Sequence, residues 1–136
     1  MNLVIDTNRI MASLIIDSTA RKILMSPFFN FFTPEFTFNE LEKYEGVIRS
    51  KGGFSHDDYK TILAILLDSI TIVPQAEYRH KISKAQTLIE DSDDVAFIAV
   101  TLAKNFHGIW TDDAHFHSTE YYLIFRTKDL VQNLES

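Results

Sequence analysis

Three aspartates crowded into four positions, immediately before an apolar segment, are the first residues that could do chemistry. They are Asp91, Asp93 and Asp94, and the apolar segment covers residues 95–100. Asp is favourable at a helix start, because its side chain accepts hydrogen bonds from the free N–H groups of the first turn. Capping needs one acid, however, and three neighbouring acids repel each other unless a positive charge lies nearby. The surplus of acids therefore indicates a cation site.

Other acids directly follow two short apolar runs. Asp6 follows residues 3–5, and Asp112 and Asp113 follow residues 108–111. Both runs read as buried strands of a parallel sheet. In an open parallel sheet, sites form at the carboxyl ends of the strands, near a change in strand order. The helix that begins at the three aspartates leads into the second of these strands, so we expect the three acid groups to converge.

Glu40 is a fourth candidate acid. It lies on a predicted helix over residues 34–48, between Phe38 and Leu41, which we expect to be buried. An acid between core residues is less easily explained as part of a solvated helix face. Glu42 is the rival for the same role.

Converging carboxylates suit hard divalent cations, and Mg²⁺ in particular takes one or two of them and keeps several waters. Such a cation can activate water and stabilise the charge that develops on a phosphoryl group. The chain has no Cys, which excludes disulfides, thiolate zinc sites and Cys nucleophiles. His115 and His117 have no third partner at a zinc-like spacing, and we interpret them as exposed loop residues. The ligand set indicates Mg²⁺ or Mn²⁺.

Short apolar runs alternate with helical segments along the chain. The predicted strands cover residues 3–5, 28–32, 70–73, 108–111 and 121–125. The predicted helices cover residues 7–15, 18–26, 34–48, 55–67, 75–90, 91–103 and 128–134, and residues 51–53 form the clearest loop. This alternation predicts an α/β fold, a three-layer α/β/α sandwich with a central, mainly parallel sheet of four to five strands.

Length and composition bound the class of protein. With 136 residues, of which 46% are hydrophobic, the chain can bury a core, and we expect residues 1–136 to form one domain. No apolar run has membrane-spanning length and the first residues do not resemble a signal peptide, so we expect a cytoplasmic protein without a membrane partner. The net charge of −6 argues against nucleic-acid binding through overall positive charge, but a nuclease can concentrate its acids in a metal site.

Four short motifs, taken in order, resemble the PIN domain family. They are Val4-Ile5-Asp6-Thr7-Asn8, Asn39-Glu40-Leu41, Asp94-Val95-Ala96-Phe97-Ile98-Ala99 and Trp110-Thr111-Asp112-Asp113-Ala114-His115-Phe116. The resemblance covers essentially the whole chain, and its specificity comes from the order and spacing of motifs that are weak alone. It implies a compact α/β domain related to the flap-endonuclease fold. Many members are metal-dependent ribonucleases, and the VapC toxins of toxin–antitoxin pairs are among them.

The resemblance also implies which residues hold the metal. The acidic cluster would be Asp6, Glu40, Asp94 and Asp113, with Asp6 and Asp94 as the principal ligands, and Thr7, Asn8 and Thr111 as positioning groups. Asp93 remains an alternative to Asp94, although the apolar register of the following helix favours Asp94. Asp112 remains an alternative to Asp113, although the family's spacing of two residues after the Thr or Ser favours Asp113.

Partners and rival functions complete these expectations. Arg9 and Lys104 are the candidates for binding RNA phosphates near the site, although no basic stripe accompanies them. The resemblance implies an RNA substrate, a homodimer and, for a toxin, an antitoxin protein. One rival is a PIN-like RNA- or protein-binding module with weak or no nuclease activity. Another is an aspartyl-phosphate protein, which Asn8 disfavours, because a haloacid-dehalogenase-type phosphatase has a second Asp there.

Overall fold

The computed structural model describes residues 1–15 and 18–135, and in this part of the chain five parallel strands form one sheet. The strands are β1 (Asn2–Ile5), β2 (Asn30–Pro34), β3 (Ile70–Val73), β4 (Gly108–Trp110) and β5 (Leu123–Phe125). Their order across the sheet is β3-β2-β1-β4-β5. The chain therefore builds outward from β1, first on one side and then on the other, and the strand order reverses at β1.

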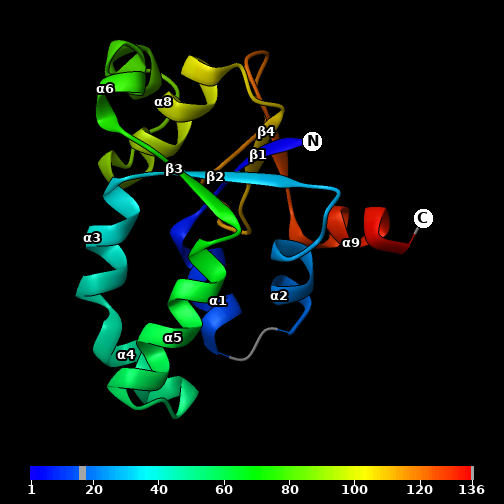
Figure 1. Ribbon diagram of the computed structural model, residues 1–136. Coiled ribbons are helices and arrows are strands. Elements are labelled where there is room, and N and C mark those ends of the chain that lie inside the picture. Colours follow the sequence, from blue (N-terminus) through cyan, green and yellow to red (C-terminus); the bar gives the residue numbers. More distant parts are fainter. Residues whose placement is uncertain (16–17, 136) are drawn as a thin grey trace.

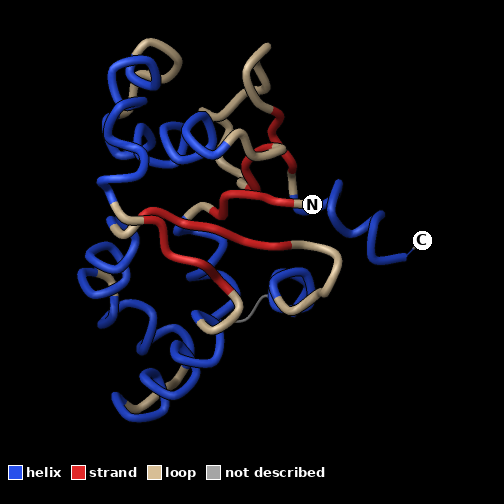
Figure 2. Tube along the Cα trace, turned by 45° about the horizontal axis from the view of Figure 1, so that its top comes forward, coloured by secondary structure: helices blue, strands red, loops and turns tan. Residues whose placement is uncertain are grey.

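Helices cover both faces of the sheet, as Figure 2 shows for the blue segments around the red strands. They are α1 (Thr7–Ile15), α2 (Ser18–Leu24), α3 (Phe36–Lys43), α4 (Glu45–Gly52), α5 (His56–Leu67), α6 (Gln75–Tyr78), α7 (Ile82–Gln86), α8 (Val95–Lys104) and α9 (Thr127–Glu135). Two 3-10 turns, η1 (Arg79–Lys81) and η2 (Ser92–Asp94), precede α7 and α8. In Figure 1, α6 and α8 lie above the sheet and α1, α2 and α5 lie below it. The predicted three-layer α/β/α class is confirmed.

The two faces of the sheet have separate hydrophobic cores. Successive side chains of a strand point to opposite faces. Leu3 and Ile5 of β1 pack with helices α1 and α2, whereas Val4 packs with α8 on the other face. All three are fully buried, as a central parallel strand requires. Because β1 is fixed from both sides, the position of the residue that follows it is fixed too.

Helix α8 is apolar nearly all round, because it is enclosed between α6, α7 and the sheet. Val95, Phe97, Ile98, Ala99 and Val100 are all buried. A helix that is hydrophobic on every side belongs in an interior. Burial of this helix fixes the position of the turn η2 at its start, and with it the last of the three crowded aspartates.

Several predicted boundaries are wrong. The helix predicted over residues 34–48 is two helices, because the backbone at Tyr44 (φ −99°, ψ 9°) ends α3 and starts α4 in a new direction. Phe38, predicted to be buried, is 42% exposed, because α3 turns Thr37 and Leu41 to the core instead. Residues 51 and 52 complete α4, and only Gly53, at φ 70°, leaves the helix.

Two further segments differ from the prediction. The helix predicted over residues 75–90 is divided into α6, η1 and α7, which pack as short pieces against α8. Strand β2 begins at Asn30, two residues later than predicted, because its pairing with β1 starts at Asn2 opposite Asn30. No helix in the described ranges combines the length and the hydrophobicity needed to cross a lipid bilayer.

Candidate metal centre

Two neighbouring strands bring acids to the same edge of the sheet. Asp6 follows β1, and its N–H donates to the carbonyl of Trp110 at the end of β4 (3.1 Å). Asp6 is only 6% exposed. Its Oδ2 accepts a hydrogen bond from the Thr111 hydroxyl (2.6 Å), and its Oδ1 accepts one from the Asn8 N–H (3.2 Å). Thr111 and Asn8 therefore hold the Asp6 carboxylate at the reversal of strand order, where sites form in open parallel sheets.

The loop after β4 presents Asp113 to the same place. The Thr111 hydroxyl accepts a hydrogen bond from the Asp113 N–H (3.1 Å), so one side chain positions both Asp6 and Asp113. Asp113 Oδ1 in turn accepts a hydrogen bond from the His115 N–H (2.9 Å). The loop is thus folded into a compact turn by its own polar groups.

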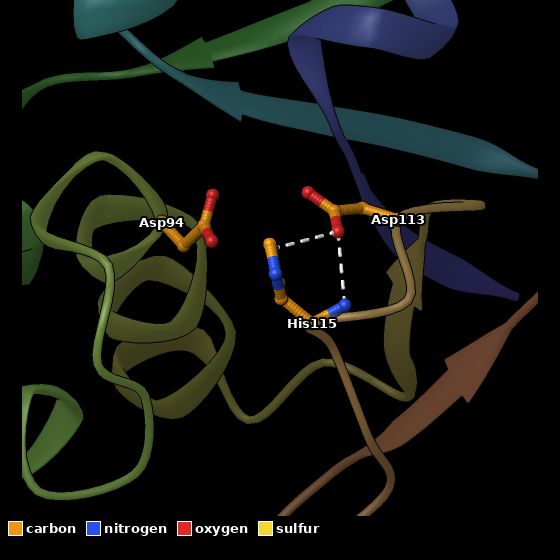
Figure 3. Close-up of side chains that lie close together, drawn as sticks. All are labelled: Asp94, Asp113 and His115. Carbon is orange, nitrogen blue, oxygen red and sulfur yellow. Dashed lines mark hydrogen bonds and ion pairs between the residues drawn. The ribbon is translucent and has the colours of Figure 1, made fainter.

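Asp94 reaches this turn from the start of α8. Asp91 is the acid that caps this turn, because its side chain accepts a hydrogen bond from the Asp93 N–H (2.9 Å). Asp94 Oδ2 is buried and has no hydrogen-bond partner among the described residues. In Figure 3 the carboxylates of Asp94 and Asp113 and the ring of His115 point toward one another. One ligand atom from each of the three lies within 4.8 Å of the others.

The acids of the cluster raise one another's proton affinity. Burial raises the pKa of Asp94 to about 7, and the negative charges of Asp91, Asp113 and Asp6 add to this effect. Burial also raises the pKa of Asp6, against the hydrogen bond from Thr111 that lowers it, and the charge of Asp113 raises it further. The structure thus brings Asp6, Asp94 and Asp113 into electrostatic contact, and among the described residues Arg9 and His115 offset only part of their repulsion. A divalent cation would relieve it.

Glu40 is connected to the cluster through Thr7, the residue that directly follows Asp6. Thr7 donates a hydrogen bond to Glu40 Oε1 (3.0 Å) and lies 3.3 Å from the Thr37 hydroxyl. Thr37 lies 2.7 Å from the hydroxyl of Thr33, and both are fully buried. Burial raises the pKa of Glu40, and the charges of Asp93 and Asp6 raise it further. Glu40 therefore lies at the rim of the cluster, on a chain of threonine hydroxyls.

The alternatives Asp93 and Asp112 face other groups. Asp93 lines a hollow of about 660 Å³ together with Glu35, Phe36 and Glu90. Asp112 accepts hydrogen bonds from the N–H and the hydroxyl of Thr127 (2.9 and 2.5 Å), at the first residue of α9. Although burial acts in the opposite sense, these bonds and the charges of Arg9 and Arg126 lower the pKa of Asp112.

Both cationic candidates form ion pairs with acids of the same chain, and the charge of Arg9 also lowers the pKa of Asp6. Arg9 forms an ion pair with Asp112 (3.0 Å). Lys104, the last residue of α8, forms an ion pair with Glu77. That helix rises ~1.5 Å per residue over its 10 residues, so Lys104 lies roughly 15 Å from its start. The expectation that Lys104 lies near the acids is wrong, because Asp94 directly precedes the first residue of α8 and Lys104 is its last residue.

Two residues of the site were not predicted from the sequence. Arg126 donates hydrogen bonds to the carbonyls of Thr111 (3.1 Å), Asp113 (2.7 Å) and Phe116 (2.6 Å), and so holds the loop that carries Asp113. Arg126 directly follows β5. Strand ends were considered above only for acids, and the same reasoning applied to cations would have selected Arg126. His115, interpreted above as an exposed loop residue, lies in the cluster, and its spacing of two from Asp113 was the available indication.

Comparison with known proteins identifies the family of this chain. A family model described as the PIN domain matches residues 4–128. The chain belongs to the PIN domain family. PIN domains are generally nucleases and generally use a divalent metal. A comparison with curated proteins gives no match.

Among solved structures, one similar to this PIN domain is the crystal structure of VapBC2 from Rickettsia felis bound to a DNA fragment from their promoter. The match has a TM-score of 0.61 and 18% sequence identity, and it covers 93% of this chain and 98% of that one. At this identity the likeness shows a common fold.

The residues of this PIN domain fit a divalent cation. The donor set is oxygen-rich, and the buried, unpartnered Asp94 Oδ2 is an atom whose desolvation nothing else in the described chain offsets. Asp94 and Asp113 would hold the ion directly, and Asp6 would hold it directly or through water.

Binding of Mn²⁺ is expected to weaken as the pH falls through 7. The pKa of Asp94 is about 7 in the folded, metal-free protein, compared with 3.8 for an unperturbed aspartate, so a proton competes with the metal below pH 7. The same shift means that the folded state binds more protons than the unfolded state between about pH 4 and 7. Stability of the metal-free protein therefore falls as the pH rises through this window. Calorimetric titration at pH 5.5, 6.5 and 8 should show a dissociation constant that rises by roughly tenfold per unit below 7. A constant affinity over this range would contradict the assignment of Asp94.

Proposed function

We propose that this PIN domain is a metal-dependent endoribonuclease that hydrolyses RNA phosphodiester bonds with Mg²⁺ or Mn²⁺, as the toxin of a toxin–antitoxin pair. The observation that carries the proposal is the convergence of Asp6, Asp94 and Asp113 at the reversal of strand order, with a buried Asp94 oxygen that lacks a partner in the described chain. Catalytic roles are assigned to Asp6, Glu40, Asp94 and Asp113.

The cation would supply activation of water and stabilisation of the negative charge on the phosphoryl group. The chain's own residues orient the site. Thr111 holds Asp6 and Asp113 together, Thr7 holds Glu40, and Arg126 fixes the loop between β4 and β5. No side-chain nucleophile is needed for this reaction.

The proposed partners are an RNA substrate, a second copy of the chain in a homodimer and an antitoxin protein. Membership of a family of nucleases supports RNA as the substrate, and the fold shared with one chain of a VapBC complex supports the antitoxin. A toxin of this kind would act in the cytoplasm, where its RNA is.

The test is cleavage of a mixed RNA pool in the presence of Mg²⁺ or Mn²⁺. We expect wild type to cleave, and Asp6→Asn and Asp94→Asn to lose at least about 100-fold of the rate, because each removes a carboxylate from the cluster. Asp57→Asn, on the exposed first turn of α5, is the matched control, because it removes the same charge away from the cluster. Equal cleavage by all four proteins would overturn the mechanism.

A second candidate is a PIN-like binding module with weak or no nuclease activity. One observation favours it: both basic residues first considered for RNA contact are paired with acids of the same chain, Arg9 with Asp112 and Lys104 with Glu77. The net charge of −6 acts in the same direction. A melting experiment separates the candidates, since a functional centre should raise the melting temperature with millimolar Mn²⁺. No shift would favour the binding module.

A further inference from the structure

His115 adds a nitrogen donor to a centre otherwise made of carboxylates. Its Nδ1 lies 3.2 Å from Asp113 Oδ1, and a ring nitrogen lies within 4.8 Å of one oxygen each of Asp94 and Asp113. The side chain is 75% exposed, so the ring is accessible to an ion arriving from solvent. Figure 3 shows the ring beside the carboxylate of Asp113 and facing that of Asp94.

The backbone of His115 is held although its side chain is exposed. Its N–H donates to Asp113 Oδ1 (2.9 Å). The next residue, Phe116, is buried in the core beside α8, and its carbonyl accepts a hydrogen bond from Arg126 (2.6 Å). The histidine is thus anchored on both sides, and only the rotation of its side chain must be fixed when a ligand binds. A donor positioned in this way costs little ordering entropy on binding.

Nitrogen and oxygen donors select different cations. Mg²⁺ prefers oxygen ligands and gives up its waters reluctantly. Imidazole suits first-row transition metals, whose divalent ions bind a given nitrogen-containing site more tightly than Mg²⁺ does, while carboxylates suit both Mg²⁺ and Mn²⁺. A centre of two carboxylates and one imidazole therefore discriminates where a centre of carboxylates alone does not.

We propose that His115 ligates the cation together with Asp94 and Asp113, and that it makes this centre prefer Mn²⁺ over Mg²⁺. The proposal rests on the proposed function, since it concerns the metal of that site. It narrows the expectation from the sequence, which allowed either ion equally and interpreted His115 as a loop residue. The buried Asp94 oxygen, which has no hydrogen-bond partner in the described part of the chain, supports it independently of the histidine, because that atom is free to accept a cation.

The experiment measures metal binding without RNA. Purified wild type, His115→Ala, His115→Asp and His117→Ala are titrated with Mn²⁺ by electron paramagnetic resonance and with Mg²⁺ by competition. His117→Ala is the matched control, because His117 lines the same hollow as His115 but lies outside the cluster. We expect His115→Ala to weaken Mn²⁺ binding by at least about tenfold and Mg²⁺ binding by less than about threefold. His115→Asp should restore binding but abolish the preference for Mn²⁺.

Electron spin echo modulation of bound Mn²⁺ gives the direct readout. Wild type and His117→Ala should show coupling to an imidazole nitrogen, and His115→Ala should not. Absence of nitrogen coupling in wild type, or an equal loss of both metals in His115→Ala, would overturn the proposal. If nitrogen coupling is present but no RNA is cleaved, the proposed function fails and the ligand assignment stands. If RNA is cleaved without nitrogen coupling, the reverse holds. Melting curves of each variant confirm that it is folded.

Discussion

Asp94→Asn is expected to abolish Mn²⁺ binding and, in the same protein, to raise the melting temperature of the metal-free form at pH 8. The two effects have one cause. The Asp94 carboxylate is desolvated and repelled by the charges of Asp91, Asp113 and Asp6, so the neutral amide relieves a cost that only a cation otherwise relieves. Loss of a residue that only supports a metal ligand already costs about 10–100-fold in metal affinity, so we expect loss of the Asp94 carboxylate itself to cost more than about 100-fold.

Asp93→Asn is the matched control, because it removes the same charge one residue earlier. Asp93 lines the hollow beside α3 and is absent from the cluster that Asp94 forms with Asp113 and His115. We expect its affinity for Mn²⁺ to stay within about threefold of wild type, since Asp93 is exposed and offers no ligand atom to the cluster. Titration calorimetry and thermal melting of both variants decide the matter. If Asp93→Asn loses Mn²⁺ binding and Asp94→Asn keeps it, Asp93 is the ligand.

Arg126→Met is expected to lower the free energy of unfolding by about 2–4 kcal/mol and to weaken Mn²⁺ binding by at least about tenfold. Its guanidinium donates to the carbonyls of Thr111, Asp113 and Phe116, which all lie in the first half of the loop between β4 and β5. Hydrogen bonds from charged groups contribute roughly 1.5–3 kcal/mol each, but contributions from one side chain are not additive. Loss of loop geometry explains the expected effect on the metal, because Asp113 depends on that loop.

Arg126→Lys tests whether the geometry or the charge of Arg126 matters. A lysine keeps the charge but cannot direct a planar fork of donors at three carbonyls, so we expect it to recover less than half of the lost stability. Arg49→Met, which removes an arginine whose ion pair with Glu45 is only partly buried, should cost under about 1 kcal/mol and leave Mn²⁺ binding unchanged. Urea denaturation and Mn²⁺ titration measure both quantities. Full recovery in Arg126→Lys would show that the positive charge, and not the three hydrogen bonds, supports the site.

Strand-end reasoning located much of this site because it depends on sequence-local facts. Asp6 directly follows one apolar run, and Asp112 and Asp113 follow another, and parallel strands place such residues at one edge whatever the rest of the chain does. The choice of Asp113 over Asp112 came from the spacing of the PIN family. Asp94 could be placed because the helix behind it is hydrophobic enough to be buried on all sides, which fixes the register of its first turn. These three positions therefore needed no knowledge of distant contacts.

Other features depended on contacts that a sequence does not display. The break at Tyr44 and the exposure of Phe38 follow from how α3 packs, since its local pattern is equally compatible with one longer helix. The ion pairs of Arg9 and Lys104 join residues 103 and 27 positions apart, and the role of these two residues in RNA contact stays a prediction. His115 was judged by its spacing to other histidines, although its partners are acids brought by the fold.

The start of α9 is connected to the loop between β4 and β5 by other contacts besides those of Arg126. Asp112 holds the N–H and hydroxyl of Thr127, and the indole N–H of Trp110 donates to the same hydroxyl (3.1 Å). The loop and the helix should consequently open as one cooperative unit in native-state hydrogen exchange. Binding of an ion at the proposed metal site would then slow amide exchange along α9, which supplies no proposed ligand. The rate of amide hydrogen exchange in α9 would therefore report whether the proposed metal site is occupied.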